Sequence, residues 1–138
     1  MKADINFEPV EGVAVAIVPD EAAAVEVGKA GWLVYLLNHN RFPIQNVIVS
    51  SNGYGVDAEG HTVRTSTLRH HFPEVAAQSA VPVEPIDPAL FHLNNQYWVS
   101  YYRDTQIFDK KFIFVPDSIV PENLIPIGLL GREGVLHS

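Results

Sequence analysis

The chain has 138 residues, of which 47% are hydrophobic, so it has enough apolar material for one domain with a single core. Nine Lys and Arg residues stand against sixteen Asp and Glu, giving a formal charge of −7. This balance argues against nucleic-acid binding, because affinity for a phosphate backbone comes largely from basic side chains. The absence of cysteine excludes disulfides, thiol nucleophiles and thiolate metal sites.

The chain shows no targeting or membrane signal. Residues 1–8 carry acids where a secretory signal would have its apolar core. The longest apolar stretches, residues 12–18 and 32–37, are far shorter than the ~20 residues that span a bilayer. Together with the lack of cysteine, these features predict a cytoplasmic protein with no membrane segment.

Three β-strands are predicted in the first half of the chain. Residues 13–18 are short, rich in β-branched side chains and followed by a proline, as is typical of a strand. Residues 32–37 are apolar on both faces, which indicates a central strand covered on both sides. Residues 44–51 form the third strand, and the glycines within residues 52–55 indicate a bulge or bend after it.

The segments between and after these strands predict turns and edge structure. Residues 20–28 are either a short helix or a mobile loop, with alanines between a capping Asp and a terminating Gly. Residues 57–60 read as a hairpin loop, and residues 61–70 as the returning strand. The prolines of residues 79–86 confine that segment to a sheet edge or bulge. Residues 87–94 predict one or two helical turns, with Asp as cap and Pro at the first helical position.

The strongest local pattern is a long hairpin over residues 96–115, with its turn at residues 103–106. If Tyr102 lies opposite Ile107, side chains alternate between two faces of the hairpin. The predicted core face carries Tyr97, Val99, Tyr101, Phe108, Phe112 and Phe114. The other face carries Trp98, Ser100, Tyr102, Ile107, Asp109, Lys111 and Ile113.

Several short strands without strand–helix alternation predict an all-β fold, an immunoglobulin-like antiparallel β-sandwich with one or two short helical turns. We expect residues 1–138 to form one domain. From about residue 116, prolines and glycines exclude a regular element of any length and predict an extended C-terminal strap. The strap would pack through Ile119, Leu124, Ile125 and Ile127.

Residues 64–71 are the most suggestive polar segment, and Arg64, Ser66, Arg69 and His70 are its candidate binding residues. Guanidinium groups and hydroxyls are the donors that an anion site uses. In a regular strand, however, Arg64, Ser66 and His70 share one face while Arg69 lies on the other. We therefore favour a half-exposed polar strand, with threonines present for their β-propensity, over a ligand site.

No catalytic, metal or cofactor site is predicted. The six histidines lack the short ligand spacings of metal sites, and Ser66 and Ser100 lie outside a G-x-S-x-G elbow. The glycines of residues 52–55 do not match a phosphate-binding loop. The pattern argues against an enzyme, although a triad assembled from distant segments would leave no local motif.

Trp98 and Tyr102 are turned away from the core by the same alternation that buries their neighbours. Either another segment covers them, or they form an interaction surface. Trp98 lies opposite Lys111 in this register, and tryptophan often dominates interface energetics. The sequence predicts binding to a protein partner or to itself, most simply as a two-fold dimer, through Trp98, Tyr102 and Lys111.

Four segments together, WLVYLLN (32–38), TSTLRH (65–70), YWVSYY (97–102) and DKKFIF (109–114), resemble a family of small uncharacterised bacterial proteins described as related to the phenylalanyl-tRNA synthetase β chain. The resemblance covers about residues 7–120 and implies a translation-related accessory role, without catalytic or binding residues. The leading interpretation is a non-catalytic interaction or assembly module. The translation role is second, and small-ligand or anion binding is third.

Overall fold

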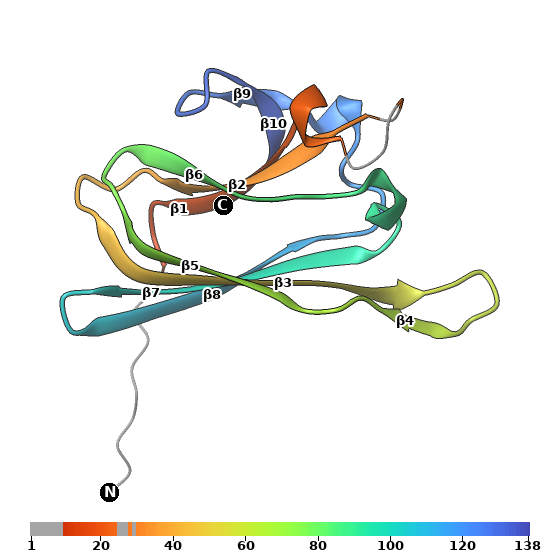
Figure 1. Cartoon of the computed structure of the whole chain (residues 1–138), viewed down its shortest axis with the longest axis horizontal. Helices are drawn as coiled ribbons and strands as arrows, with labels where there is room; N and C mark the ends of the chain where they lie inside the picture. Colours follow the sequence, from red (N-terminus) through yellow and green to blue (C-terminus); the bar gives the residue numbers. More distant parts are fainter. Residues whose placement is uncertain (1–9, 25–27, 29) are drawn as a thin grey trace, which may run out of the picture.

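The computed structural model describes residues 10–24, 28 and 30–138, and these residues form two antiparallel β-sheets (Figure 1). The first sheet has the order β6 (Ser79–Pro85), β2 (Trp32–Asn38), β1 (Val13–Pro19), β10 (Arg132–His137) and β9 (Ile125–Ile127). The second has the order β4 (Thr62–Arg64), β3 (Ile44–Val56), β7 (Asn94–Arg103) and β8 (Gln106–Phe114), with β5 (Leu68–Val75) also paired to β3. The predicted all-β sandwich is confirmed.

Helical structure among the described residues is restricted to three short 3-10 turns: η1 (Glu21–Ala23), η2 (Pro88–Leu90) and η3 (Pro121–Asn123). Asp20 and Asp87 cap the first two by accepting the backbone N–H groups two residues later. The turn expected within residues 87–94 is therefore present, whereas residues 25–27 of the expected helix or loop lie outside the described residues. Within the described part of the chain, no helix has the length and apolar character needed to cross a membrane.

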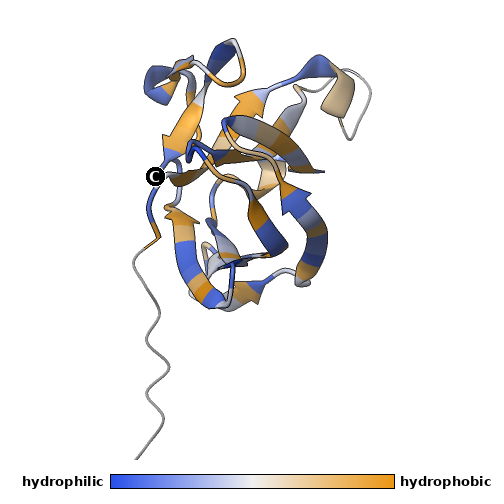
Figure 2. Ribbon diagram, turned by 90° about the vertical axis from the view of Figure 1, so that its left-hand side faces the viewer, coloured by the Kyte–Doolittle hydropathy of each residue, from blue (hydrophilic) through white to orange (hydrophobic). Residues whose placement is uncertain are grey.

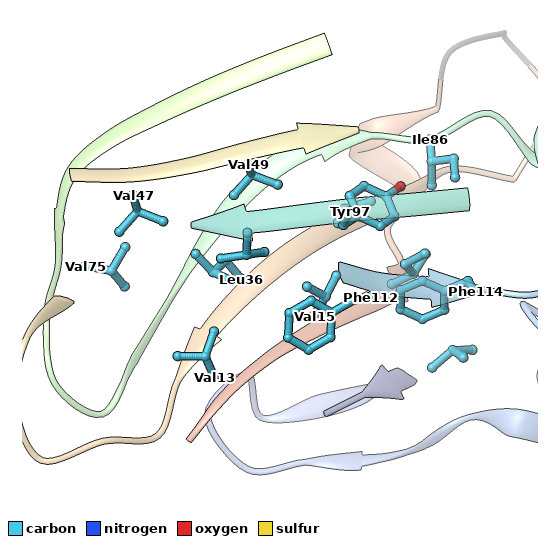
Figure 3. Close-up of a cluster of buried hydrophobic side chains, with 14 of the residues drawn as sticks. Val13, Val15, Leu36, Val47, Val49, Val75, Ile86, Tyr97, Phe112 and Phe114 are labelled. Atoms are coloured by element: carbon cyan, nitrogen blue, oxygen red, sulfur yellow. The ribbon is translucent and has the colours of Figure 1, made fainter. Parts of the chain in front are cut away.

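The core lies between the two sheets and follows the period-two alternation of the strands, which Figure 2 shows as alternating hydrophobic and hydrophilic residues. The predicted hairpin register is confirmed, with Tyr102 opposite Ile107 and Tyr97 opposite Phe112. Its predicted core face is buried, except that Phe108 is only partly buried. Figure 3 shows Tyr97, Phe112 and Phe114 among aliphatic side chains such as Val15 of β1.

The C-terminal tail differs from the extended strap expected from about residue 116. Residues 125–127 and 132–137 form strands, and β10 pairs with β1 through Val15–His137 and Ile17–Val135. The glycines do not prevent this, because Gly131 supplies a left-handed backbone (φ +65°) in the connecting turn and Gly134 fits against the buried side chain of Val18. The tail also contributes to a second apolar cluster, whose buried members are Ala14, Ala16, Val18, Leu37 and Ile127.

Strand β3 continues to Val56 through residues 52–55, where a bulge or bend was expected, and it stays in register with β7 from Ile48 to Tyr54. Gly53 and Gly55 lie under neighbouring side chains instead, since a Cβ on Gly53 would come within 3.1 Å of Thr65 Cγ2. The irregularity in β3 lies earlier, between Gln45 and Ile48, where the register with β7 shifts.

The returning strand predicted over residues 61–70 is interrupted. Tyr54 pairs with Arg64, but Ser51 pairs with Leu68, so three residues of the returning chain lie opposite two residues of β3. At this interruption Gly53 N–H donates to Thr65 Oγ1 over 2.7 Å. The extra residue separates β4 from β5 and changes which side chains share a face.

Candidate functional site

The outer face of the second sheet, directed away from the first sheet, is open. Residues directly opposite across an antiparallel pair lie on the same face, so the registers align side chains into rows. One row is Lys111, Trp98, Ser50 and Arg69, and the next is Asp109, Ser100, Ile48 and His71. These two rows together with Tyr102 are called the Trp98 face. Among the described residues, no element covers this face (Figure 1).

Trp98 is held in a defined position although its side chain is 42% exposed. Its indole N–H donates to Asp109 Oδ2 over 2.9 Å, and Lys111 Nζ lies 4.6 Å from the ring centroid. The cation–π contact and the hydrogen bond together restrain the ring without covering it. A shallow depression of about 260 Å³ lies beside the ring, lined by Ile48, Ser50, Arg69, Trp98, Ser100 and Asp109.

Two further large apolar side chains are exposed on the Trp98 face, Ile48 at 37% and Tyr102 at 39%. Tyr102 comes from the turn end of β7, as expected, whereas Ile48 comes from β3 and was not singled out in the sequence. Its place beside Trp98 depends on the register between β3 and β7. Apolar groups set among polar ones are typical of protein interfaces.

The Trp98 face carries charges of both signs. Arg69 and Lys111 lie at the two ends of the Trp98 row, and Asp109 lies in the next row. Arg69 Nε contacts Ser50 Oγ at 3.4 Å. Arg64, opposite Tyr54 on β4, is directed to this same side of the sheet.

This position of Arg64 corrects one expectation. A regular strand would place Arg64 with Ser66 and His70, and Arg69 on the opposite face. Because of the extra residue between β4 and β5, Arg64 instead shares the outer face with Arg69. The four candidate binding residues therefore separate into an outer arginine pair and an inner pair, Ser66 and His70.

His70 and Ser66 lie near the open edge between the two sheets. His70 Nε2 is 2.6 Å from Glu84 Oε1, and Ser51 Oγ donates to the same oxygen over 2.8 Å. Since Glu84 belongs to β6, these contacts join the edge strands of the two sheets. Ser66 lines a cleft of about 320 Å³ beside this contact, which we call the Glu84 cleft.

The contacts among Ser51, Glu84 and His70 do not form a hydrolytic triad. In a triad the imidazole lies between the hydroxyl and the carboxylate, so that it can remove the hydroxyl proton. Here the carboxylate lies between the other two groups, and Ser51 has no recorded contact with His70. The geometry of these three residues indicates a structural link or a ligand-binding edge rather than nucleophilic catalysis.

Two buried tyrosines have perturbed acidity. Burial raises the pKa of Tyr97, and the negative charge of Glu84 raises it further. Burial raises the pKa of Tyr101 to about 12; Arg103 opposes this increase and Glu11 adds to it. Neither hydroxyl is therefore suited to act as a base near neutral pH.

The loop between β3 and β4 brings Asp57, Glu59 and His61 close together, with potential ligand atoms within 4.8 Å of one another. Asp57 Oδ1 already accepts the backbone N–H groups of Glu59 and His61. His61 Nδ1 lies 3.3 Å from Asp57 Oδ2. Closure of this exposed loop accounts for the cluster, and we assign no metal to it.

Glu84 is the main residue of the site that the sequence analysis did not identify. It is the only charged residue of β6 and lies between Pro82 and Pro85. An isolated acidic residue in a predicted edge strand is a sequence feature that could have identified it as a candidate. Its partners Ser51 and His70 come from β3 and β5, so only the packing of the sheets shows the cluster.

No family model and no curated protein matches the chain. The resemblance to proteins related to the phenylalanyl-tRNA synthetase β chain stays a prediction. The Trp98 face and the Glu84 cleft are the two surface features from which a function can be inferred.

Proposed function

We propose that this chain is a non-catalytic interaction module that associates with a second copy of itself through the Trp98 face. The observation that carries the proposal is Trp98, whose indole is 42% exposed and yet restrained by Asp109 and Lys111. An aromatic side chain that is already restrained loses little conformational freedom on binding. It also offers a large apolar area to a partner.

A two-fold interface must be complementary to itself, because the same patch contributes from both copies. The Trp98 face meets this requirement through its two charge signs. Arg69 and Lys111 of one copy can face Asp109 of the other when the two sheets lie face to face with their rows crossed. The apolar side chains of Trp98 and Ile48 then lie in the centre of the contact, where water is excluded.

The charge distribution favours this face over other parts of the surface. The whole chain carries a formal charge of −7, so two copies repel each other on average. Arg64, Arg69 and Lys111 place positive charge on the side of the second sheet that carries Trp98. The local repulsion between copies is therefore smaller for contact through this side.

Analytical ultracentrifugation over a wide concentration range tests the proposal with three proteins: the wild type, Trp98→Ala and the control Ile125→Ala. Ile125 is 44% exposed on β9 of the other sheet, so its truncation removes a comparable exposed apolar group. We expect the wild type and Ile125→Ala to dimerise, and Trp98→Ala to remain monomeric. A wild type that is monomeric at every concentration contradicts the proposal, as does a Trp98→Ala protein that dimerises normally.

Thermal melting of the same variants separates an interface role from a structural one. Because Trp98 is partly exposed, Trp98→Ala should destabilise the monomer by much less than the ~3–5 kcal/mol of a buried tryptophan. A loss of that full size would place Trp98 in the structural core and remove the basis of the proposal.

A further inference from the structure

The Glu84 cleft lies where the end of β6 faces the interruption between β4 and β5, at the open edge of the sandwich. Its volume of about 320 Å³ is at the lower end of the range for small-molecule sites. Residues from five parts of the chain line it: β3, the β4–β5 interruption, the start of β5, the end of β6 with the residues through η2, and β7. The walls are therefore set by the packing of both sheets.

One wall of the cleft carries the carboxylate of Glu84, whose two oxygens the described residues do not fully use. Ser51 and His70 both contact Oε1 of Glu84, and Oε2 has no recorded hydrogen bond to the described residues. Asn52, which follows Ser51 on β3, lies opposite Gln96 and so places its side chain on the outer face of the sheet, away from this wall. The wall therefore offers Oε2 of Glu84 as its free acceptor among the described residues. A poorly exposed acceptor without a donor costs free energy that a ligand donor would recover.

The remaining walls are apolar. They consist of Leu68, Pro85, Ile86, Leu90 and the ring of Tyr97. Leu68 is half exposed at the edge of the cleft, opposite Ser51 in the β3–β5 pair. A ligand that fits both parts of the cleft needs a donor group at one end and an apolar body at the other.

The charges around the cleft select the sign of the ligand. Among the residues that the structure describes, the charged residues lining the cleft are Glu84 and Asp87, with no Lys or Arg beside them. Glu84 is poorly solvated, with its side chain only 11% exposed. A carboxylate or phosphate would be repelled here, whereas an ammonium group would form a charge-assisted hydrogen bond.

We propose that the Glu84 cleft binds a small organic cation, a primary ammonium group attached to an apolar chain or ring. The ammonium donates to Glu84 Oε2. The apolar body packs against Leu68, Ile86 and Leu90. This site is independent of the Trp98 face, because Glu84 faces the space between the sheets and Trp98 faces outward.

Titration of the full chain with three cyclohexane derivatives, followed by amide chemical shifts at mildly alkaline pH, tests this assignment. Cyclohexylamine, cyclohexanol and cyclohexanecarboxylate share a ring and differ in charge. Cyclohexylamine should cause saturable shifts at residues 51–53 and 84–87. Cyclohexanol should bind more weakly than cyclohexylamine by a factor of about ten or more, because it cannot form the charge-assisted hydrogen bond.

Glu84→Gln keeps the shape and the acceptor of Glu84 and removes its charge, so it should weaken cyclohexylamine binding about tenfold or more. Asp57→Asn is the control, since it removes an acid that does not line the cleft, and it should leave binding unchanged. Leu68→Lys gives a second test that leaves Glu84 intact. The new ammonium at the edge of the cleft should occupy the site and prevent binding of the probe.

Several results would overturn the proposal. One is the absence of saturable shifts with cyclohexylamine, and another is equal binding of the amine and the alcohol. Stronger binding of the carboxylate would reverse the assigned charge. Unchanged amine binding in a folded Glu84→Gln or Leu68→Lys protein would remove Glu84 from the site. Failure of any of these tests leaves dimerisation through Trp98 unaffected, so the two proposals stand or fall separately.

Discussion

The indole N–H of Trp98 donates to Oδ2 of Asp109 over 2.9 Å, although the residue directly opposite Trp98 on β8 is Lys111. Asp109 is the diagonal neighbour, paired in the backbone with Ser100. The diagonal hydrogen bond inclines the indole along the strand and leaves Lys111 Nζ over its ring. The orientation of the proposed contact residue therefore depends on one carboxylate.

Asp109→Ala should weaken dimerisation several-fold without a large change in thermal stability. The substitution removes the hydrogen bond to the indole, which contributes about 0.5–1.5 kcal/mol at an exposed site, and also the charge that faces Arg69 and Lys111 of the second copy. Asp109→Asn removes the charge but retains an acceptor oxygen for the indole, so it should lose less. Sedimentation equilibrium of the three proteins measures the difference, and equal association of Asp109→Ala and the wild type would show that the indole orientation is unimportant.

Gly134→Ala should destabilise the fold by about 1–3 kcal/mol through overpacking. A Cβ at this position would lie 2.4 Å from Val18 Cγ1 and 2.9 Å from Ile127 Cδ1. Val18 is completely buried and β-branched, so it has little freedom to move away. Gly128→Ala is the matched control, since no atom lies within 4 Å of the position that its new methyl group would take, and its stability should be nearly unchanged. Chemical denaturation compares the two, and equal stabilities would contradict the close contact.

Asn38→Ala should cost about 2–4 kcal/mol, because Asn38 is fully buried and connects three parts of the backbone. The two N–H groups of its Nδ2 reach three carbonyl oxygens, those of Phe42, Val75 and Ala76, so one of these hydrogen bonds is bifurcated. Its Oδ1 accepts from Asn40 N–H. These bonds join the end of β2 to the turn that leaves β5.

Asn123→Ala serves as the control for Asn38, because Asn123 also donates from its amide to a backbone carbonyl, that of Ser118, but at an exposed site. Its loss should cost less than about 1 kcal/mol. Urea unfolding measures both variants, and an Asn38→Ala protein no less stable than Asn123→Ala would show that this buried network contributes little.

Alkaline pH should destabilise the protein through its buried tyrosines. The pKa of Tyr101 is raised to about 12 in the folded protein, against an ordinary value of 10.0, and the pKa of Tyr97 is also raised. Above pH ~10 the unfolded chain loses these protons while the folded chain keeps them, so the free energy of unfolding falls as pH rises. The slope is up to about 1.4 kcal/mol per pH unit for each tyrosine until the folded pKa is reached.

Unfolding measured between neutral and strongly alkaline pH, for the wild type and for Tyr97→Phe with Tyr101→Phe, tests this dependence. The double variant should lose most of the decline, because phenylalanine has no proton to release. Ultraviolet titration gives an independent measurement. Because Tyr97 and Tyr101 ionise only at higher pH, replacing them should not lower the phenolate absorbance that appears first as the pH is raised. If the free energy of unfolding falls equally with pH in the double variant, other titrating groups cause the fall.

The hairpin of β7 and β8 could be predicted in detail because its information is local. Alternation of apolar and polar side chains allows one register, in which Tyr97 lies opposite Phe112, and a shift by one residue would bury Trp98 and Lys111 instead. The outward position of Trp98 followed from the same alternation. The elements expected at residues 13–18 and 32–37 were also recognisable from short apolar runs bounded by turn residues.

The position of Arg64 could not be predicted, because it depends on one extra residue opposite β3. The interruption is stabilised by the hydrogen bond between Gly53 N–H and Thr65 Oγ1, which connects β3 to the returning chain. The Glu84 contacts have the same character, since Ser51, His70 and Glu84 come from three strands in two sheets. Pairing between distant segments carries no periodic signal in the sequence.

The location of β10 places a constraint on how the chain can fold. Val15 pairs with His137, so the strand beside β1 comes from the opposite end of the sequence. During synthesis β1 and β2 can pair early, but the other edge of β1 stays unpaired until residues 132–137 are available. An unpaired edge is a site of association with other chains, and such long-range pairing slows folding. Early intermediates should therefore be more prone to aggregation than the completed sandwich, and a chain lacking residues 132–137 should retain that tendency permanently.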